Sequence, residues 1–356
     1  MNQVRTLSFA GQNIYCGIDV HKKNWAVCVR DDSFELKTFS QTPKAEILVD
    51  FLKKNYPQAN YYAVYEAGFS GYWTQRALTQ HGVNCSVVHP ADVPTRDKDR
   101  QQKTDRVDCR KLAMALKDKR IEGIYIPSEQ QVDDRDILRG RQQLVQDQTR
   151  HKNRILSWLI FHGHLIPEGY KTSSHFSNRF VGWLENLTVS ESAKTSLHLK
   201  LQSLKQVRSL LLEANRYIRR LSGRDDYKAS VGLLRSIPGI GMINAMIFLT
   251  ELGDIRRFKN MDKLCSYVGL TPNIYSSSET IHVKGITHRC NHILREALVE
   301  STWCAVRKDP SLLKAYHQYV NRMNSNKAII KVARKMLNRI RFVLLNRTKY
   351  VIGVVQ

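Results

Sequence analysis

Two different spacings of hydrophobic residues follow one another along the first 125 residues of the chain. One is the short apolar pattern of strands, and the other is the helical spacing in which apolar residues recur every three or four positions. The strand pattern covers residues 13–20, 25–30, 34–39, 61–66 and 84–89, and the helical pattern covers residues 45–55, 72–81 and 104–119. The sequence therefore predicts a mixed α/β domain at the N-terminal end.

These elements are in the order of a ribonuclease-H-like α/β domain, three strands and then alternating helices and strands, which we expect over residues 10–125. Asp19 ends the first predicted strand and Glu66 ends the fourth. Asp105 and Asp108 are three residues apart, so a helix presents both on one side. Four carboxylates that converge from two strand ends and one helix can hold two Mg²⁺ ions about 3.5–4 Å apart.

Each of these acids also has a purely structural interpretation. Asp105 and Asp108 are favoured as negative charges at the start of a helix, and Asp19 and Glu66 are common residue types in turns. We prefer the metal site because all four acids occur together in this order of strands.

The middle segment, residues 126–230, changes to long helices. Residues 137–160 predict a basic helix, and a second helix ends at Gly223. The second helix has a heptad pattern of about three repeats, which indicates a coiled-coil seam. This seam can join two helices of one chain or two copies of the protein, and the basic exposed faces suit a phosphate backbone. Its residues are Leu197, Leu204, Leu211 and Ile218, with Val207, Ala214 and Leu221 at the complementary positions.

We expect a mainly helical C-terminal domain over residues 231–350. It begins with a glycine-rich turn. Gly239 and Gly241 precede an apolar helix at residues 242–252. Glycines permit a tight turn, and the free N–H groups of the following helix can receive a DNA phosphate. We interpret this turn as a helix-hairpin-helix element; the alternative is an ordinary connection between helices.

A serine-rich loop follows an aromatic segment expected to be a strand, residues 267–275. Ser276, Ser277 and Ser278 come directly after it, and a basic turn with Lys284 and Arg289 comes next. Serine clusters are common in solvated loops, but a loop between an aromatic strand and a basic turn can also carry an exposed nucleophile. The residues alone leave both interpretations open.

The segment from residue 310 to residue 350 is basic and contains no acidic residue. Arg334, Lys335 and Arg339 lie beside an apolar stripe that includes Leu337 and Ile340, which predicts a basic amphipathic helix. Such a helix suits either a nucleic acid or a membrane surface, and the rest of the chain favours nucleic acid.

Composition narrows the class of partner. The 356 residues contain 56 Lys and Arg against 32 Asp and Glu, a formal net charge of +24. A surplus of this size favours a polyanionic partner, above all nucleic acid. The seven cysteines are scattered and odd in number, which argues against a disulfide framework and a structural zinc site. With no leader and no apolar run of membrane length, we expect a cytoplasmic protein, associated with the nucleoid of a prokaryotic cell and not with a membrane.

Five short motifs together give the chain a family resemblance. In order along nearly the whole chain they are Ile18-Asp19-Val20-His21-Lys22-Lys23, Tyr65-Glu66-Ala67-Gly68, Lys103-Thr104-Asp105-Arg106-Val107-Asp108, Ile237-Pro238-Gly239-Ile240-Gly241 and Gly269-Leu270-Thr271-Pro272. This set resembles the DEDD-type insertion-sequence transposases, relatives of the Piv DNA invertase. The resemblance implies a RuvC-like N-terminal domain whose quartet is Asp19, Glu66, Asp105 and Asp108.

The same resemblance implies a C-terminal transposase domain with a catalytic serine, whose place falls best on Ser277. Many relatives have glycines directly after that serine, whereas this chain has Ser278 and Glu279, so Ser276 and Ser278 are the alternatives. Members of this family form dimers that assemble into tetramers, and a structured bridge RNA guides them to double-stranded DNA. The resemblance thus implies that Ser277 attacks a DNA phosphate, polarised by Mg²⁺ on the quartet, and forms a phosphoserine intermediate.

Two other functions are compatible with the residues. A RuvC-like endonuclease of Holliday junctions would use water as its nucleophile, and its C-terminal domain would only hold DNA. A non-enzymatic scaffold for nucleic acid would use the acids structurally. Metal-dependent strand cleavage separates the scaffold from both enzymes, and a covalent protein–DNA adduct separates the recombinase from the nuclease.

Overall fold

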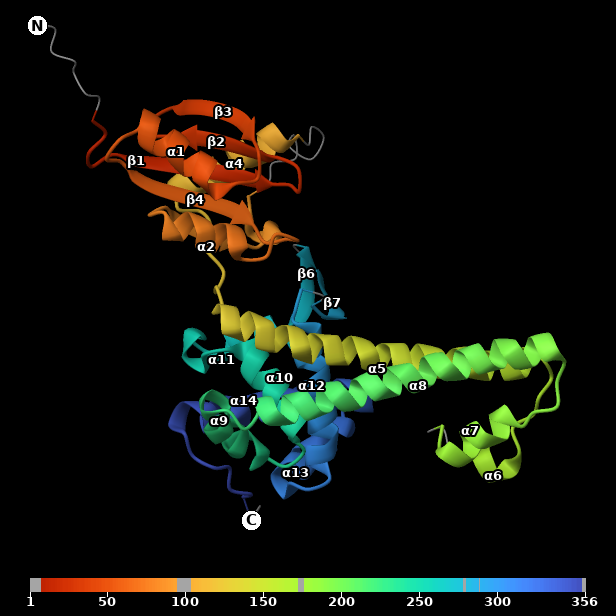
Figure 1. The fold of residues 1–356 in the computed structure, drawn as a ribbon. Helices are drawn as coiled ribbons and strands as arrows, with labels where there is room; N and C mark the ends of the chain where they lie inside the picture. Colours follow the sequence, from red (N-terminus) through yellow and green to blue (C-terminus); the bar gives the residue numbers. More distant parts are fainter. Residues whose placement is uncertain (1–7, 95–103, 172–175, 278–279, 288, 354–356) are drawn as a thin grey trace, which may run out of the picture. The chain divides into compact units, whose positions relative to one another are not determined.

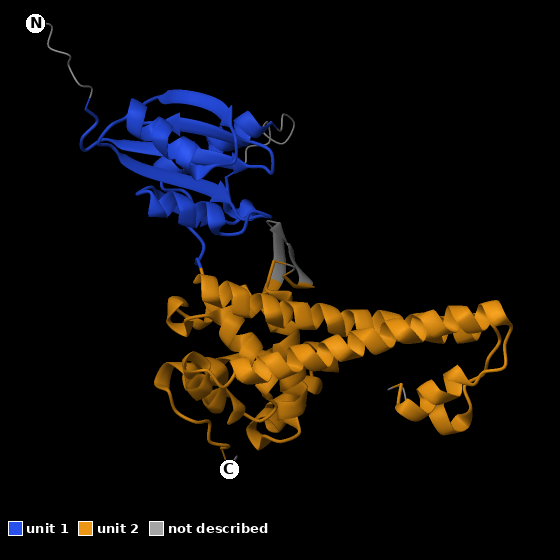
Figure 2. Cartoon of the chain, in the orientation of Figure 1, with its two compact units in different colours: residues 1–126 blue, residues 127–356 orange. Residues whose placement is uncertain are grey.

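The computed structural model describes residues 8–94, 104–171, 176–277, 280–287 and 289–353, with the side chains of residues 171 and 273–284 left out. The chain divides into two compact units, residues 1–126 and residues 127–356 (Figure 2). The second unit therefore contains both the middle segment and the C-terminal region, which the sequence pattern separates at residue 230.

A five-stranded sheet forms the centre of the first unit (Figure 1). Its strands are β1 (Asn13–Val20), β2 (Trp25–Arg30), β3 (Glu35–Gln41), β4 (Asn60–Glu66) and β5 (Asn84–Val88), and the 3₁₀ turn η1 (Pro90–Asp92) follows. The strand order is β3-β2-β1-β4-β5. The first three strands pair antiparallel, while β4 pairs parallel with both β1 and β5. This arrangement confirms the predicted mixed α/β domain and is consistent with a ribonuclease-H-like fold.

Two helices cover one face of this sheet. They are α1 (Ala45–Asn55) and α2 (Trp73–Gln80), and each buries the apolar side of its helical pattern. Leu48 of α1 and Leu78 of α2 join the same buried cluster as Ile18 of β1. The hydrophobic residues that predicted these helices are therefore the ones that hold them on the sheet.

The opposite face of the sheet is covered by α4 (Asp105–Lys117). Ala113 packs with Ala26 of β2, and Leu112 packs with Val64 of β4. Small residues on both sides allow this helix to lie close to the strands. The sheet thus has helices on both faces, and α4 is the one that contains two of the predicted acids.

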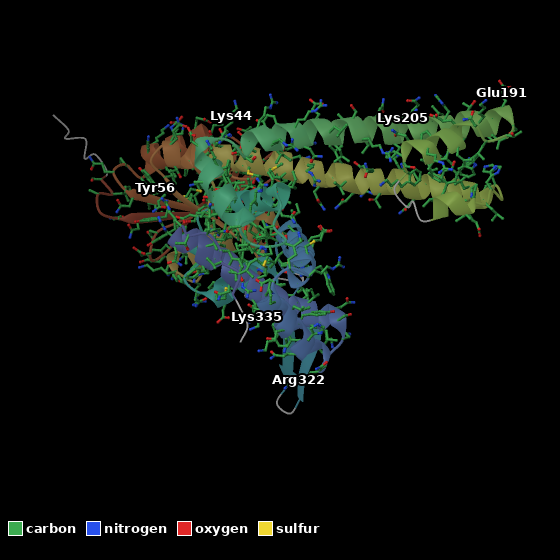
Figure 3. The ribbon with its side chains drawn as sticks, turned by 90° about the horizontal axis from the view of Figure 1, so that it is seen from below. Lys44, Tyr56, Glu191, Lys205, Arg322 and Lys335 are labelled. Carbon is green, nitrogen blue, oxygen red and sulfur yellow. The ribbon has the colours of Figure 1, made fainter. Side chains whose placement is uncertain are left out.

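Two long helices, α5 (Glu129–Phe161) and α8 (Glu191–Leu221), lie side by side in the second unit (Figures 1 and 3). The predicted heptad leucines of α8 are buried within the chain, and Arg141 of α5 donates to Asn215 Oδ1 at 2.8 Å. Of the two interpretations left open, this packing is that of a helical hairpin within one chain.

The segment that connects α5 to α8 packs at the outer end of this hairpin and is rich in aromatic residues. It forms two short helices, α6 (Glu168–Lys171) and α7 (Asn178–Glu185). Phe180 and Leu184 of α7 are buried with Trp158 of α5 and with leucines of α8. The sequence pattern made no prediction for this segment.

The remaining helices pack around α10, whose residues from Ala245 to Leu252 are mostly buried. Its Phe248 is fully buried in the same core as Leu298 and Met336 from helices later in the chain. The elements here are α9 (Asp225–Arg235), α10 (Met242–Leu252), η2 (Ile255–Arg257), α11 (Met261–Val268), β6 (Pro272–Ser277), β7 (Thr280–Ile286), α12 (His292–Val306), α13 (Pro310–Val320) and α14 (Ser325–Asn346). The predicted mainly helical character of this region is confirmed.

The basic segment after residue 309 forms two helices. Asp309 caps the first, α13, by accepting from the backbone N–H groups of Ser311 and Leu312 at 2.9 Å and 3.2 Å. Asn324 caps the second, α14, by accepting from Lys327 N at 2.9 Å. Because capping residues satisfy otherwise free N–H groups, each favours a new helix start.

A buried carboxylate joins the base of the helical hairpin to the C-terminal helices. Glu251 of α10 is 1% exposed and accepts two hydrogen bonds from Arg139 of α5, at 2.8 Å and 3.0 Å. Asn291, which caps α12, donates to the same carboxylate at 2.6 Å, and Arg135 Nε lies 3.5 Å from it. The charge of Glu251 is therefore paired on several sides, as a buried charge requires.

Among the helices of the described residues, none is both long enough and apolar enough to cross a membrane.

Candidate active site

Asp19 is the penultimate residue of β1, and Glu66 is the last residue of β4, the neighbouring parallel strand. In the register of this pair Ile18 lies opposite Tyr65, so the two acids follow at the same edge of the sheet. Ile18 and Tyr65 are fully buried on the face covered by α1 and α2. Because successive side chains of a strand point to opposite faces, Asp19 and Glu66 point to the face covered by α4.

Gly17 allows α4 to lie directly against β1. A Cβ atom at this position would lie 2.0 Å from the carbonyl oxygen of Cys109 and 2.4 Å from the backbone nitrogen of Ala113. Both neighbours are backbone atoms of a helix, so they cannot move aside cheaply. Gly17 therefore fixes the distance between β1 and α4. It was not among the predicted site residues, although a glycine inside an apolar strand is a signal of close backbone approach.

The first turn of α4 contains Asp105 and Asp108. Thr104 begins this helix, because its hydroxyl accepts a hydrogen bond from Val107 N at 3.3 Å. Asp108 accepts from Lys111 Nζ at 3.1 Å, one turn further along the same helix. Capping by Thr104 thus determines where the helix starts and hence which residues its first turn presents.

His21 lies between two of the four acids. Its Nε2 atom is 3.2 Å from Asp19 Oδ2 and 3.6 Å from Asp105 Oδ1. The ligand atoms of these three residues all lie within 4.8 Å of one another, and among the described residues this is the only such group of three acidic, histidine or cysteine side chains. His21 belongs to the motif around Asp19, residues 18–23, but was not predicted as a site residue.

The environment of Asp19 disfavours its charged form. Burial raises the pKa of Asp19 above its ordinary value, and the carboxylates of Asp105 and Asp108 raise it as well, whereas His21 lowers it. Asp19 therefore experiences the negative potential of both acids on α4. Negative charges gathered in this way are stabilised by a bound cation.

The donor set of this site fits a hard divalent cation. Carboxylate oxygens are the preferred ligands of Mg²⁺ and Mn²⁺, whereas a zinc site would favour sulfur and nitrogen. Asp19 provides a partly buried oxygen, with its side chain 24% exposed, and Asp105 provides an accessible one at 56% exposed. The residues present can thus hold a Mg²⁺ ion at the edge of the sheet.

The candidate serines lie on the hairpin of β6 and β7, in the second unit. Ser276 pairs with Ile281 and Ser277 pairs with Thr280, which places Ser277 at the end of β6. Ser278 lies outside the described residues, as do the side chains of Ser277 and Lys284. The strand expected from residue 267 begins only at Pro272, because residues 261–268 form α11, which Gly269 ends with a φ of +85°.

Arg295 of α12 holds both ends of this hairpin together. Its NH1 group donates to the carbonyl oxygen of Gly269 at 3.4 Å, before β6, and to that of Thr287 at 3.0 Å, after β7. The backbone of Thr287 also donates to the carbonyl oxygen of Thr271 at 3.0 Å. The base of the serine hairpin is therefore attached to the helical core by the guanidinium of Arg295, which was not among the predicted site residues.

The glycines of the predicted helix-hairpin-helix turn have different environments. Gly239 has a φ of +87°, and a Cβ atom there would lie 2.2 Å from the carbonyl oxygen of Ser301. Gly241 is exposed at the start of α10, and a Cβ atom there would meet nothing within 4 Å. Gly239 thus serves the packing of this turn on α12, while Gly241 leaves the helix start accessible.

The predicted phosphate-binding cations also differ from one another. Lys335 of α14 is exposed, and Arg334 is half exposed but donates to Asp262 Oδ1 at 2.6 Å. Arg339 is only 21% exposed; its guanidinium lies 5.4 Å from the ring centre of Tyr350 and 3.9 Å from Asp309 Oδ2. Arg339 therefore packs against the C-terminal segment, because α14 turns this position toward the core.

The last of these cations, Arg289, is exposed beside the serine hairpin, and its backbone N–H donates to Thr287 Oγ1 at 3.2 Å.

The first unit has the strand order of a ribonuclease-H-like domain. Its acids lie near the ends of two adjacent strands and in the first turn of α4, the helix that packs on those strands. These features define the DEDD type of this domain. Comparison with known families agrees with this class. A transposase model of the DEDD type of IS110 matches residues 16–162, and the model of the transposase IS116/IS110/IS902 family matches residues 231–318. The chain belongs to this family of insertion-sequence transposases.

Individual relatives of the chain are also named as transposases. The chain is 31% identical to the transposase for insertion sequence element IS1533 of Leptospira borgpetersenii over 257 residues, 70% of this chain and 72% of the relative. It is 29% identical to the putative transposase y4qE of Sinorhizobium fredii over 293 residues, 81% of this chain and 71% of the relative. It is 25% identical to the transposase for insertion sequence element IS1111A of Coxiella burnetii over 279 residues, 75% of this chain and 73% of the relative.

Proposed function

We propose that this transposase cleaves and rejoins DNA through a Mg²⁺ site on Asp19, Glu66, Asp105 and Asp108 and a serine nucleophile, Ser277. The observation that carries the proposal is the convergence of Asp19 and Asp105 around His21 at the edge of the sheet. Its geometry depends on the close approach of α4 to Gly17. The family model over residues 16–162 supports the assignment of this region to a DEDD transposase domain.

Each acid has a part in this proposal. Asp19 and Glu66 would provide oxygens from the sheet, and Asp105 and Asp108 would provide them from α4; carboxylates of this kind are the ligands that Mg²⁺ prefers. Bound Mg²⁺ supplies positive charge that polarises a DNA phosphate. His21 Nε2 lies at hydrogen-bond distance from Asp19 and 3.6 Å from Asp105, and Lys111 donates to Asp108.

The nucleophile of this proposal is the hydroxyl oxygen of Ser277. It forms a bond to the phosphorus of a DNA phosphodiester while the bond from phosphorus to the sugar oxygen of the leaving strand breaks. The serine gives up its proton to a base or to water, and the leaving oxygen gains one. A sugar hydroxyl then reverses these steps on the phosphoserine, so that the strand is rejoined without loss of the phosphate bond. The hairpin position of Ser277 supports this role because Arg295 fixes the base of that hairpin.

Nucleic acid binding in this proposal uses the helix start at Gly241, the exposed Lys335, Lys284 on β7 of the serine hairpin and Arg289 beside that hairpin. Exposed backbone N–H groups at a helix start bind phosphate. A structured guide RNA and assembly from dimers into tetramers complete the proposal, and these two parts rest on the family resemblance.

The carboxylate site is tested with single substitutions. Asp19→Ala, Glu66→Ala, Asp105→Ala and Asp108→Ala should each abolish Mg²⁺-dependent strand cleavage and leave DNA binding within about twofold. A matched control is Asp50→Ala, an exposed acid on α1 in the same unit. Wild-type cleavage rates in the Asp105→Ala and Asp108→Ala proteins would show that the site is assigned to the wrong acids.

The serine is tested by trapping the covalent intermediate. Denaturing a reaction midway should give a protein–DNA adduct whose digested peptide carries the phosphate on Ser277, and Ser277→Ala should abolish it. Ser276→Ala and Ser278→Ala are the controls and should be milder. An adduct on Ser276 or Ser278 would move the nucleophile by one position. Normal cleavage by Ser277→Ala without any adduct would make water the nucleophile, and the chain a nuclease of the junction type.

The guide RNA is tested by purifying the protein together with the noncoding DNA that flanks its gene. A discrete RNA should remain bound to the protein, and ribonuclease treatment should stop recombination. Recombination that continues after ribonuclease treatment and without the flanking region would exclude RNA guidance.

A further inference from the structure

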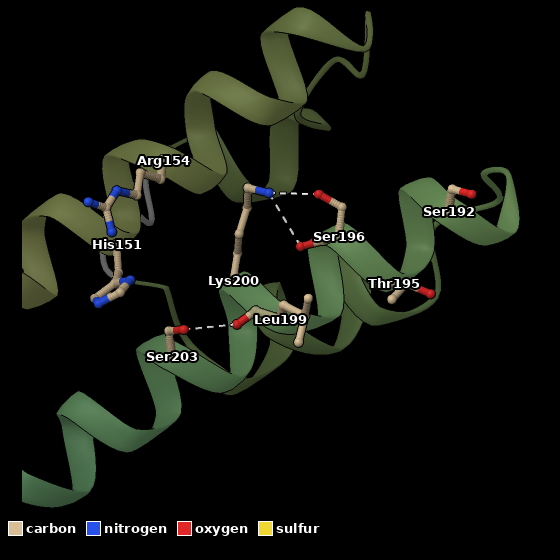
Figure 4. A pocket seen from close by; sticks show the side chains of 8 residues that line it. All are labelled: His151, Arg154, Ser192, Thr195, Ser196, Leu199, Lys200 and Ser203. Carbon is tan, nitrogen blue, oxygen red and sulfur yellow. Dashed lines mark hydrogen bonds between the residues drawn. The ribbon is translucent and has the colours of Figure 1, made fainter.

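The outer half of the helical hairpin contains a groove between α5 and α8, shown in Figure 4. Its volume is about 390 Å³, and it is open to solvent along one side. His151 and Arg154 of α5 and Lys200 of α8 lie around it, and none of the residues that line it is acidic. Neither the metal site nor the serine hairpin includes any of these residues.

Small hydroxyl side chains keep the groove open along α8. Ser192, Thr195, Ser196 and Ser203 recur at helical spacing on one side of this helix. Thr195 Oγ1 donates to the carbonyl oxygen of Glu191 and Ser203 Oγ to that of Leu199, both at 3.0 Å. These hydroxyls are thus folded back on their own helix (Figure 4), so that the groove remains free of longer side chains.

Lys200 is held in position before any ligand arrives. Its ammonium donates to Ser196 Oγ at 2.7 Å and to the carbonyl oxygen of Ser196 at 3.4 Å. Because an ammonium has three donors, one of them remains for a ligand. Arg154 lies across the groove on α5, so positive charge comes from both helices (Figure 4).

The length of the groove distinguishes a chain of phosphates from a single anion. From Ser192 to Ser203 it follows about 16 Å of α8, at about 1.5 Å per residue. A nucleic-acid strand carries one phosphate per roughly 3.4 Å of its axis, and its backbone winds around that axis, so more than one consecutive phosphate can lie along this distance. Cations from two helices, with no carboxylate among the lining residues, are the chemistry that receives a phosphodiester backbone.

We propose that this groove is a separate binding site for the phosphodiester backbone of a nucleic acid, with Arg154 and Lys200 as its principal contacts. The site binds by charge and does not read bases. It lies on the helical hairpin, so its occupation does not depend on whether Ser277 is the nucleophile. Duplex DNA and structured RNA share the required chemistry, and the experiment separates them.

The test compares two double substitutions in the full chain. Arg154→Gln with Lys200→Gln removes two positive charges from the groove. Arg150→Gln with Lys205→Gln removes the same charge from the same two helices, at residues that do not line the groove and that pair with Asp147 and Glu185. Affinity for a duplex DNA and for a hairpin RNA is measured over a series of salt concentrations. For the groove variant, the slope of log affinity against log salt should fall by about 1.8 with duplex DNA, since each lost phosphate contact contributes about 0.9.

The control variant should retain the wild-type slope. If the groove variant loses affinity for only one of the two nucleic acids, that nucleic acid is the occupant of the groove. If it loses affinity for both, the groove binds the backbone of either one. Equal losses in the groove and control variants, or no loss in either with both nucleic acids, overturn the proposal. Arg154→Lys with Lys200→Arg keeps the charge and should bind within about twofold of wild type, which separates loss of charge from loss of folding.

Discussion

Asp19 is a residue whose ionisation should oppose folding of the metal-free protein. Burial raises its pKa, and the carboxylates of Asp105 and Asp108 raise it further. A carboxyl group with a higher pKa in the folded state keeps its proton to a higher pH there than in the unfolded chain. At pH values above the folded-state pKa of Asp19, its ionisation therefore lowers the free energy of unfolding by the full amount. This destabilisation disappears as the pH falls below 3.8, the ordinary pKa of an aspartate.

We predict that Asp19→Asn raises the Tm of the metal-free protein by a few degrees at about pH 7. The gain should shrink as the pH is lowered toward about 4, because Asp19 of the wild type then becomes protonated in both states. Thermal unfolding followed by circular dichroism measures both effects, with Asp50→Asn on α1 as the control. Added Mg²⁺ should stabilise the wild type and not Asp19→Asn. A gain that is equal at both pH values would show that charge is not its cause.

Gly17 and Gly140 should respond to alanine in opposite directions. At Gly17 a Cβ atom would lie 2.0 Å from the carbonyl oxygen of Cys109, so we expect Gly17→Ala to destabilise the protein by about 1–3 kcal/mol. It should also abolish cleavage, because α4 moves with its two acids. At Gly140 within α5 nothing lies within 4 Å, so Gly140→Ala should stabilise the protein by up to about 1 kcal/mol. Denaturant unfolding measures both values.

At the scale of elements, the hairpin of β6 and β7 depends on one side chain of α12. Arg295 donates to carbonyl oxygens on both sides of this hairpin, at Gly269 and Thr287. A two-stranded hairpin is marginally stable by itself. The orientation of the serines should therefore depend on Arg295 even though this residue belongs to another element.

We predict that Arg295→Gln reduces the rate of adduct formation at least tenfold, while DNA affinity changes less than about twofold. Arg295→Lys should recover part of the rate, since a lysine can reach one of the two carbonyl oxygens. Arg307→Gln, at the C-terminal end of the same helix, removes the same charge from an exposed position and should have little effect. The measurement is the rate of the trapped covalent adduct. A parallel loss of DNA affinity would instead assign Arg295 to nucleic acid binding.

Helix boundaries show where a local pattern misleads. The basic helix predicted from residue 137 begins at Glu129, because Ser128 caps it by accepting from Gln131 N at 3.2 Å. Its first turns contain Asp134 and Arg135, whose charges are typical of a solvated segment. In the structure both are buried: Asp134 accepts from Tyr227 at 2.8 Å, and Arg135 donates to the carbonyl oxygen of Thr250. Partners from distant parts of the chain decide whether such residues are buried.

At the scale of the whole molecule, the chain consists of two compact units with separate cores, residues 1–126 and 127–356. Separate cores can unfold separately. We predict two transitions in a calorimetric scan of the metal-free protein. Asp19→Asn should shift only the transition of the first unit.

Glu251→Gln should lower only the other transition. This substitution removes the charge that Arg139 and Asn291 bind, and we expect a loss of about 1–3 kcal/mol. A single transition that both substitutions shift equally would show that the two units unfold together.

The sequence by itself determined the order of the strands and helices in the first unit and the mainly helical character of the second. Both follow from periodic patterns of apolar residues, which depend only on neighbours along the chain. The sequence also located Asp19 and Glu66 at strand ends and Asp105 and Asp108 in one helical turn, since a strand or helix repeats with a fixed period. The charge surplus indicated a nucleic-acid partner without knowledge of the structure, because net charge does not depend on the fold.

Tertiary structure alone decided which side chains from distant segments meet. It placed His21 between Asp19 and Asp105, and it made Gly17 the contact point of α4. It also paired the heptad leucines of α8 within the chain and turned Arg339 toward Tyr350. These outcomes depend on how close two backbones can pack and on which face of a helix meets the core. A contiguous pattern does not contain that information, because both partners of each contact lie far apart in the sequence.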